Sequence, residues 1–317
     1  MSAEPLPPPP LDPLLIRDRL LAAGWTDREI RWRVRTGGWV QLRFGVYVEA
    51  AVLASLADQP ARLHALYVRA ALHRLAGRRL AASHESAALL LGIDLLDPSR
   101  GVTITRDVAE GRHVQRYRSL AVHSAALPRG HVHVAELFDV PVTSASRTVV
   151  DLARTRSRRH AVVAADSALH SGRVTEEQLL RMLDDVDGWP GALAARDVVR
   201  FADGRAESVL ESLSRVGIDE CGLPAPEPQV TIGDDAGTTA RVDFLWREHH
   251  TIGEADGLTK YVDRADKMAE RRRQDWVESL GLEVVRWTIE DLSGRRLLAL
   301  RRRVEEKFAR AHQRWGD

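Results

Sequence analysis

The sequence has a single cysteine, Cys221, among 317 residues. One thiol excludes an intrachain disulfide framework and any zinc site built from several cysteines, and it fits a reducing compartment. The chain also lacks an apolar run of membrane length, because its longest apolar stretches, such as residues 87–93, are far shorter than a bilayer span. We therefore expect a cytoplasmic protein with no membrane partner.

Charge of one sign is not in excess either. The 46 lysine and arginine residues balance 45 aspartate and glutamate residues, for a net charge of +1, so any affinity for nucleic acid has to come from local patches. Lysine is scarce, since nearly every basic residue is arginine. The length predicts two or three domains, and a hydrophobic content of 44% is enough for packed cores.

Three acidic residues gather in the C-terminal third of the sequence. Residues 240–246 alternate with period two, which predicts a strand that carries Asp243. Residues 251–256 predict a second strand, and a hairpin of the two would bring Glu254 and Asp256 towards Asp243. Such carboxylates repel one another unless a cation lies among them, and their hard oxygens suit Mg²⁺ or Mn²⁺. The sequence therefore predicts a divalent metal site.

A fourth oxygen ligand is available upstream. Residues 204–213 have the pattern of an amphipathic helix, in which Glu207 and Glu211 lie one turn apart on the same face. Either glutamate can complete the predicted metal site. Each of these features also has a structural interpretation, since helix glutamates are usually solvated and an Asp-Gly pair after a strand is often only a turn.

The order of these features resembles the PD-(D/E)XK nuclease superfamily, and most closely its very-short-patch-repair branch. The resemblance is carried by Glu211 in a helix, Val-Asp243-Phe, Gly-Glu254-Ala-Asp256-Gly, a basic helix at residues 271–275 and an apolar strand at residues 281–288. It covers about the last third of the chain. It implies a restriction-endonuclease-like α/β/α sheet in which acids hold a metal beside a scissile phosphate.

The resemblance also implies roles for individual residues. Asp243 and Glu254 would hold the metal, with Glu211 completing its coordination, and Arg271, Arg272 and Gln274 would hold flanking DNA phosphates. The sequence departs from the family at the usual lysine, where it has Asp256. Lys260, four residues further on, can reach back to serve that role, so catalysis and loss of catalysis both stay open.

The N-terminal residues 12–50 predict a small winged helix-turn-helix. A helix would begin at Asp12, a second would be capped by Thr26 with Glu29, an arginine-rich third would end near Gly37, and a β-ribbon would turn at Gly45. The ribbon and the third helix would bring arginines to DNA, although a solvated face is the alternative. These residues are Arg28, Arg31, Arg33, Arg35 and Arg43.

This region resembles the N-terminal domain of AbiEi-like antitoxins of type IV toxin-antitoxin systems, in the sequences Gly37-Gly38-Trp39 and Gly45-Val-Tyr47. The resemblance implies a winged helix that reads operator DNA, and a cognate toxin or other defence protein as a partner. Residues 61–203 resemble the second domain of the same family, a mixed α+β domain, through Ser83 to Ala88 and Pro-Val-Thr-Ser144. The scattered histidines of this region, among them His84 and His123, lack the spacing of metal ligands.

The sequence therefore predicts a multidomain α/β protein with a disordered proline-rich tail at residues 1–11, a winged helix at 12–50, a middle domain at 61–203 and a nuclease-like domain at 204–317. The first functional hypothesis is a DNA-binding, metal-dependent endonuclease. The alternative is a non-catalytic, antitoxin-like transcriptional repressor. A protein that only holds a partner is a third possibility, and no motif supports it.

Overall fold

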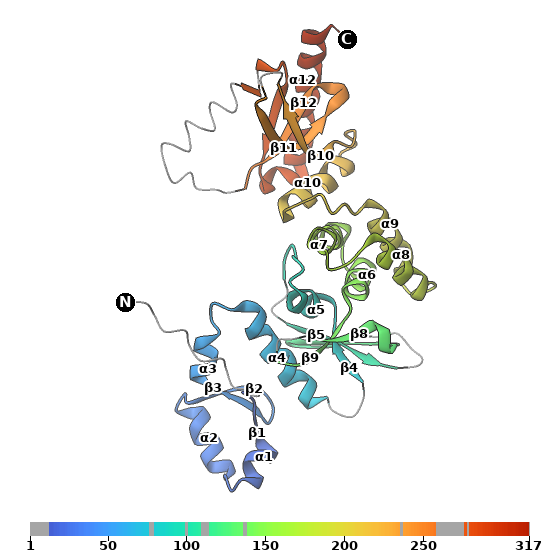
Figure 1. Cartoon of the computed structure of the whole chain (residues 1–317). Coiled ribbons are helices and arrows are strands. Elements are labelled where there is room, and N and C mark those ends of the chain that lie inside the picture. Colours follow the sequence, from blue (N-terminus) through green and yellow to red (C-terminus); the bar gives the residue numbers. More distant parts are fainter. Residues whose placement is uncertain are drawn as a thin grey trace. The chain divides into compact units, whose positions relative to one another are not determined.

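The computed structural model of the chain describes residues 13–75, 79–98, 101–108, 114–135, 138–234, 237–257, 276–277 and 279–316. The protein is of mixed α/β class, and these described residues form three sheets (Figure 1). It divides into two compact units, residues 1–155 with 176–195 and residues 156–175 with 196–317. No helix in the described ranges combines the length and apolar character needed to cross a bilayer.

The first unit begins with a three-stranded sheet in the order β1-β3-β2 beside short helices. Its elements are β1 (Leu15–Ile16), α1 (Arg17–Ala22), α2 (Asp27–Arg35), β2 (Trp39–Arg43), β3 (Val46–Glu49) and α3 (Ala50–Ser55). The predicted ribbon and its turn at Gly45, where φ is +72°, are confirmed. The helix expected from Asp12 is wrong in its start, because Leu15 and Ile16 pair with β3 and α1 begins at Arg17.

The predicted second and third helices of this region are one helix, α2. Thr26 is its N-cap, and the capping box is complete, because Thr26 Oγ1 accepts the Glu29 backbone N–H and the Glu29 carboxylate accepts the Thr26 N–H at 2.7 Å. No glycine or proline lies between Thr26 and Thr36, so the turn that Thr26 caps continues without a break into the arginine-rich segment.

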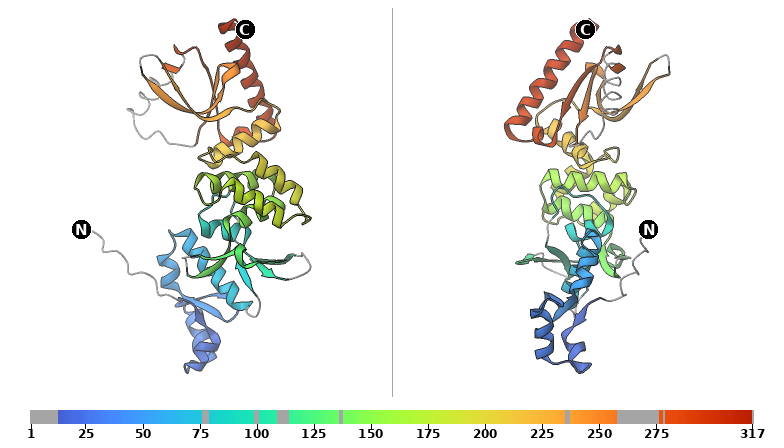
Figure 2. Two further views of the ribbon diagram at one scale, coloured as in Figure 1. Left: turned by 45° about the vertical axis from the view of Figure 1, so that its right-hand side comes forward. Right: turned by 90° about the vertical axis from the view of Figure 1, so that its left-hand side faces the viewer.

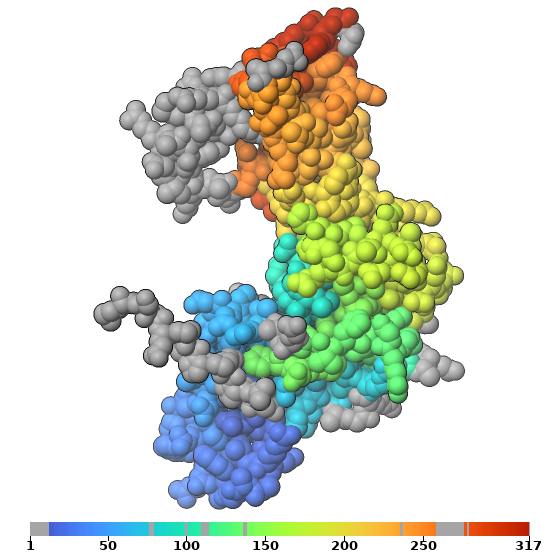
Figure 3. Space-filling model, in the orientation of Figure 1, coloured from blue at the N-terminus to red at the C-terminus, as the bar shows by residue number. Residues whose placement is uncertain are grey.

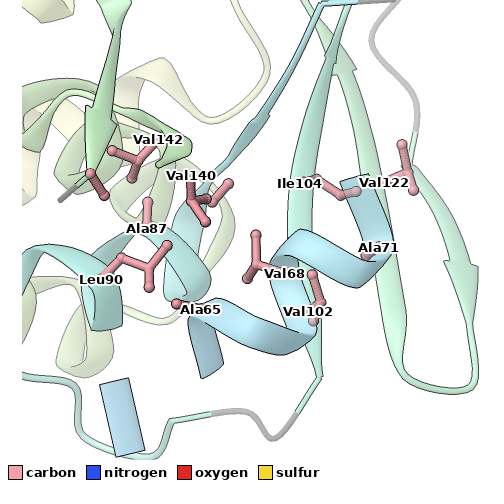
Figure 4. Packing of buried hydrophobic residues seen from close by; sticks show 12 residues of the cluster. Ala65, Val68, Ala71, Ala87, Leu90, Val102, Ile104, Val122, Val140 and Val142 are labelled. Atoms are coloured by element: carbon pink, nitrogen blue, oxygen red, sulfur yellow. The ribbon is translucent and has the colours of Figure 1, made fainter. Parts of the chain in front are cut away.

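A six-stranded mixed sheet, in the order β6-β7-β5-β4-β9-β8, forms the centre of the first unit. Small and β-branched side chains of this sheet pack against α4 and α5. Ile104 of β5 and Val68 of α4 belong to this core (Figure 4). The elements are α4 (Pro60–Arg74), β4 (Leu80–Ala82), α5 (His84–Leu91), β5 (Val102–Asp107), β6 (Val114–Tyr117), β7 (Leu120–Ala125), β8 (Val132–Ala135), β9 (Val140–Thr143), α6 (Ala145–Thr155), α8 (Glu176–Asp185) and the start of α9 (Ala192–Phe201).

Two buried histidines in this unit make its stability sensitive to pH. Burial lowers the pKa of His84 to about 3 and that of His64 to about 4. The unfolded chain therefore binds more protons below about pH 6.5, and stability falls as pH falls from there towards the folded pKa values. For His84 alone, the loss between pH 7 and pH 5 is about 2 kcal/mol.

We predict that His84→Asn reduces this loss. Asparagine does not titrate and tolerates the positive φ of +50° at this position. Urea unfolding of the wild type and the variant at pH 7 and pH 5 measures the effect, and the comparison cancels the contributions of other groups. An equal pH-dependent loss in both proteins would show that His84 is not buried in its neutral form.

The second unit contains α7 (Arg158–His170), the end of α9, α10 (Val209–Glu220), a four-stranded sheet and α12 (Gly294–Trp315). The sheet has the order β10-β11-β12-β13, with only β12 and β13 parallel. Its strands are β10 (Glu227–Gly233), β11 (Thr239–Trp246), β12 (Thr251–Ala255) and β13 (Glu283–Trp287). The two predicted strands at 240–246 and 251–256 are therefore confirmed.

Tryptophans hold α10 and α12 to one face of this sheet, along which α12 runs (Figure 2). Trp287 is only 2% exposed, stacks on Phe244 at 5.6 Å between ring centroids, and donates from Nε1 to Ser214 Oγ of α10 at 2.7 Å. Gly253 of β12 leaves room for this ring, because a Cβ there would lie 2.4 Å from Trp287 Cη2. The opposite face of the sheet carries the candidate acids.

Helix α7 joins the second unit through a buried ion pair. Asp166 is fully buried, and its carboxylate accepts from Arg215 Nη1 of α10 at 2.7 Å and from the backbone N–H of Asp203 at 2.8 Å. Desolvation raises the pKa of Asp166 in spite of this cation. The second unit thus includes α7 in addition to the C-terminal residues from 204 onward.

Candidate functional site

A row of charged side chains crosses the C-terminal sheet. In the antiparallel pair of β11 and β12, Phe244 lies opposite Gly253, so the next position along the ladder places Asp243 opposite Glu254. In the parallel pair of β12 and β13, Glu254 is the register partner of Arg286. Register partners project to the same side of a sheet, so Asp243, Glu254 and Arg286 lie side by side on one face.

The row is hydrogen bonded and largely shielded from solvent. Arg286 Nε donates to Glu254 Oε2 at 2.8 Å, and Glu254 is 7% exposed. Asp243 Oδ2 accepts the backbone N–H of Ala255 at 2.8 Å. The guanidinium therefore supplies the positive charge that two neighbouring carboxylates require. Sequence reasoning missed Arg286, because the parallel register of β12 and β13 cannot be read from the residues between them.

Asp256 lies one residue beyond the end of β12. Its backbone N–H donates to Trp287 O at 2.8 Å, which continues the pairing with β13, and its side chain is half-buried. Among the residues that the structure describes, no group of three or more histidine, cysteine, aspartate or glutamate side chains is placed to hold a metal. Lys260, Arg271, Arg272 and Gln274 lie outside the described residues.

The two upstream glutamates have different positions. The prediction that they share a helical face is wrong, because α10 begins at Val209, after its N-cap Ser208, and Glu207 precedes the helix. Glu207 forms a two-pronged ion pair with Arg241, with both distances 2.7 Å. Glu211 is buried in the first turn, where its carboxylate accepts from Ser208 Oγ at 2.8 Å and from the Glu207 N–H at 3.0 Å.

Gln229 of β10 is hydrogen bonded to Glu211, and its register position lies beside the charged row. The antiparallel register of β10 and β11 places it opposite Asp243, between the pairs Pro228–Phe244 and Val230–Val242. Its Nε2 donates to Glu211 Oε2 at 2.7 Å, while its Oε1 is buried and has no hydrogen-bond partner in the described part of the chain. Its φ of +55° is a strained conformation for a residue with a side chain, of the kind that gathers at functional sites.

Nothing in the sequence marks Gln229, since a glutamine in a strand has no special pattern. Only the pairing of β10 with β11 and the dihedral angle reveal it. The structure therefore brings together Asp243, Glu254, Arg286 and Gln229 across four strands, with Glu211 bound to the last of them.

A second candidate site lies on α2 at the N-terminal end of the chain. Three exposed arginines, Arg28, Arg31 and Arg35, are spaced three and four residues apart and so share a face of the helix. With Trp32, which is 49% exposed, they line a groove of about 700 Å³ that also includes Gln41 of β2. The blue N-terminal part of the chain, which contains α1 and α2, lies at the surface in the space-filling view (Figure 3).

The other two predicted DNA-contacting arginines are engaged within the protein. The guanidinium of Arg33 lies over the rings of Trp25 and Trp32, at 5.9 and 5.5 Å from their centroids. Arg43 donates to the hydroxyl and the backbone oxygen of Ser119, each at 2.8 Å, and burial lowers its pKa. The exposed cationic face of α2 is therefore formed by Arg28, Arg31 and Arg35.

Comparison with known proteins yields relatives of similar length. No family model matches the chain. It is 29% identical over 267 residues to the proteins named Uncharacterized protein MT2308 and Uncharacterized protein Rv2248, from two strains of Mycobacterium tuberculosis, an overlap that covers 84% of this chain and 92% of each relative. A crystal structure of the RV2827C protein from the same species has a TM-score of 0.37 at 17% identity, covering 59% of this chain and 71% of that one.

Proposed function

We propose that the C-terminal unit hydrolyses phosphodiester bonds of DNA with the aid of Mg²⁺ or Mn²⁺. The observation that carries the proposal is the register of β11 and β12, which places two carboxylates side by side on a shielded face. Gln229, whose register position is opposite Asp243, adds a buried amide oxygen that has no hydrogen-bond partner among the described residues, and hard oxygens are the ligands that such ions bind. This donor set fits a hard divalent cation.

In this proposal Asp243 and Glu254 hold the metal, which would polarise the phosphate and lower the pKa of an attacking water. Glu211 fixes the amide of Gln229 through its hydrogen bond and so limits the rotation of that side chain. Asp243 is itself held by the backbone of Ala255, which limits its freedom to turn away. The protein thus contributes a pre-arranged set of oxygens on a rigid sheet.

Arg286 has two roles in this proposal. Without a metal its guanidinium pairs with the Glu254 carboxylate at 2.8 Å and balances the charge of that carboxylate. With DNA present, the fork of its guanidinium is suited to a phosphate oxygen next to the scissile bond. It thereby supplies a cation on the same face where the resemblance places a lysine and the sequence has Asp256.

The test is cleavage of plasmid and short duplex, single-stranded and mismatched DNA by the purified full chain with Mg²⁺ or Mn²⁺. We expect nicking that disappears in excess EDTA and returns when Mn²⁺ is restored. Absence of cleavage on every substrate would reject the proposal.

A second function is favoured by a different observation, the exposed cationic face of α2. Here the chain is a DNA-binding regulator that resembles AbiEi-like antitoxins, with the segment up to residue 50 acting as a winged helix on operator DNA and a cognate toxin or other defence protein as partner. The Arg286–Glu254 ion pair would then be a structural element of a domain that binds without cutting. Both functions require DNA and place the protein in the cytoplasm.

Both functions also give a prediction for α2. The double substitution Arg31→Ala and Arg35→Ala removes two exposed phosphate contacts, so we expect weaker DNA binding and a salt dependence, d log K/d log[salt], that is flatter by about 2. Fluorescence anisotropy with labelled duplex across a salt series measures this. Arg181→Ala, at another exposed helical arginine, is the matched control. An unchanged slope in the double variant would remove α2 from the DNA-binding surface.

A further inference from the structure

A small pocket lies in the first unit, where α5 and α6 meet the six-stranded sheet. We name it the His84 pocket; its volume is about 210 Å³, room for roughly seven water molecules. It contains the N-terminal residue of α5, a threonine and a histidine of the sheet, and charged residues of α6. Its lining includes His84, Thr105, His123, Arg147, Asp151 and Arg154.

The pocket has a buried hydroxyl without a partner. Thr105 is 1% exposed, and its Oγ1 makes no hydrogen bond to any residue that the structure describes. Thr105 and His123 are register partners on β5 and β7, so both side chains lie on the same side of the sheet. Buried polar groups nearly always have a partner, so an unpaired hydroxyl that lines a cavity points to a missing ligand or bound water.

The charge of the pocket is positive. Arg147 Nε and Arg154 Nη1 donate to different oxygens of Asp151, at 2.7 and 2.8 Å. Two guanidiniums and one carboxylate leave a net charge of +1, and all three side chains are at least nine-tenths buried. Each oxygen of Asp151 already accepts a hydrogen bond from one of the two arginines. The charge that remains for a ligand in the pocket is therefore positive. A cation would be repelled from it.

The backbone at His84 also favours an anion in the pocket. His84 is the first residue of α5, where helix N–H groups favour an anion, and its φ of +50° is strained. Its ring stacks on His123 at 3.9 Å between centroids. Gly191, which also lines the pocket, lies against α6, because a Cβ at this position would be 2.3 Å from the backbone oxygen of Arg154.

We propose that the His84 pocket binds an oxyanion, as inorganic phosphate or as the phosphate group of a small monoester. The N-terminal end of α5 and the excess charge of the arginines attract it, and the Thr105 hydroxyl donates a hydrogen bond to one of its oxygens. The site lies in the first unit, and it does not depend on the nuclease proposal for the second.

Thermal unfolding of the full chain at constant ionic strength tests this site. We expect saturable stabilisation by inorganic phosphate or by adenosine monophosphate, and none by chloride. Tighter binding of the nucleotide would identify a phosphate ester as the ligand, and tighter binding of inorganic phosphate would identify the free ion. No saturable stabilisation by either compound would overturn the proposal.

Thr105→Val removes the hydroxyl at nearly constant volume and should weaken binding at least tenfold. Thr103→Val, at a buried threonine of the same strand outside the pocket lining, should leave binding unchanged. Equal affinity in wild type and Thr105→Val would overturn the role of the pocket. If Thr105→Val does not fold, wild-type crystals soaked in tungstate decide, since the proposal requires an anomalous peak beside Thr105 Oγ1 and a peak only elsewhere contradicts it.

Discussion

Asp243→Asn and Glu254→Gln should each lower the rate of Mg²⁺- or Mn²⁺-dependent DNA cleavage by about 10²–10³-fold or more, a loss of the size that follows removal of one group that stabilises transition-state charge. Each change keeps the shape of the side chain and removes the charge that holds the metal. The two residues are direct neighbours across β11 and β12, so the double variant should be little worse than either single variant.

The matched control is Glu283→Gln. Glu283 is a buried glutamate of β13 whose carboxylate pairs with Lys307 and Arg314 of α12, on the other face of the same sheet. It should keep full cleavage activity even if stability falls. If Glu283→Gln lost its cleavage activity, or if Asp243→Asn kept it, DNA cleavage would not depend specifically on the charged row.

Trp287→Ala should destabilise the second unit by about 3–5 kcal/mol, the cost of removing a large buried side chain. Trp287 packs against Phe244 and Trp246, fills the space above Gly253, and binds Ser214 of α10. Chemical denaturation followed by tryptophan fluorescence and by circular dichroism measures the loss. The DNA affinity of α2 should be unaffected at temperatures where both units are folded.

Trp287→Phe provides the comparison for this prediction. It keeps a ring against Phe244 but loses the Nε1 hydrogen bond, so it should cost about 1 kcal/mol for the bond in addition to a smaller cavity term. A cost equal to that of Trp287→Ala would mean that the hydrogen bond to Ser214, rather than the packing of the ring, stabilises the sheet against α10.

The local pattern of residues predicted much of the fold. Period-two alternation predicted β11, the short segment before Asp256-Gly257 predicted β12, and Thr26 with Glu29 predicted the start of α2. The pattern failed where tertiary pairing outweighs it. Leu15 and Ile16 lie in the segment expected to be helical from Asp12, but they form a strand because they pair with β3. Ser208 caps α10 after Glu207, so that glutamate lies outside the helix.

The candidate site was only half accessible from the sequence. Asp243 and Glu254 could be paired because they belong to neighbouring strands joined by a short turn. Arg286 could not, since β12 and β13 are paired across a long connection that does not fix their register. Gln229 could not, since a glutamine in a strand has no special pattern. The His84 pocket could not be predicted for a similar reason, because α5 and β7 bring together His84 and His123, which are 39 positions apart in the sequence.

Asp243 and Glu254 should together hold one divalent ion, and binding of Mn²⁺ tests this most directly. We expect crystals of the full chain soaked in MnCl₂ to show an anomalous peak in contact with carboxylate oxygens of both residues, and Asp243→Asn crystals to lack it. An unchanged Arg286–Glu254 ion pair with no Mn²⁺ at the row, at concentrations that saturate ordinary metallonucleases, would contradict the account.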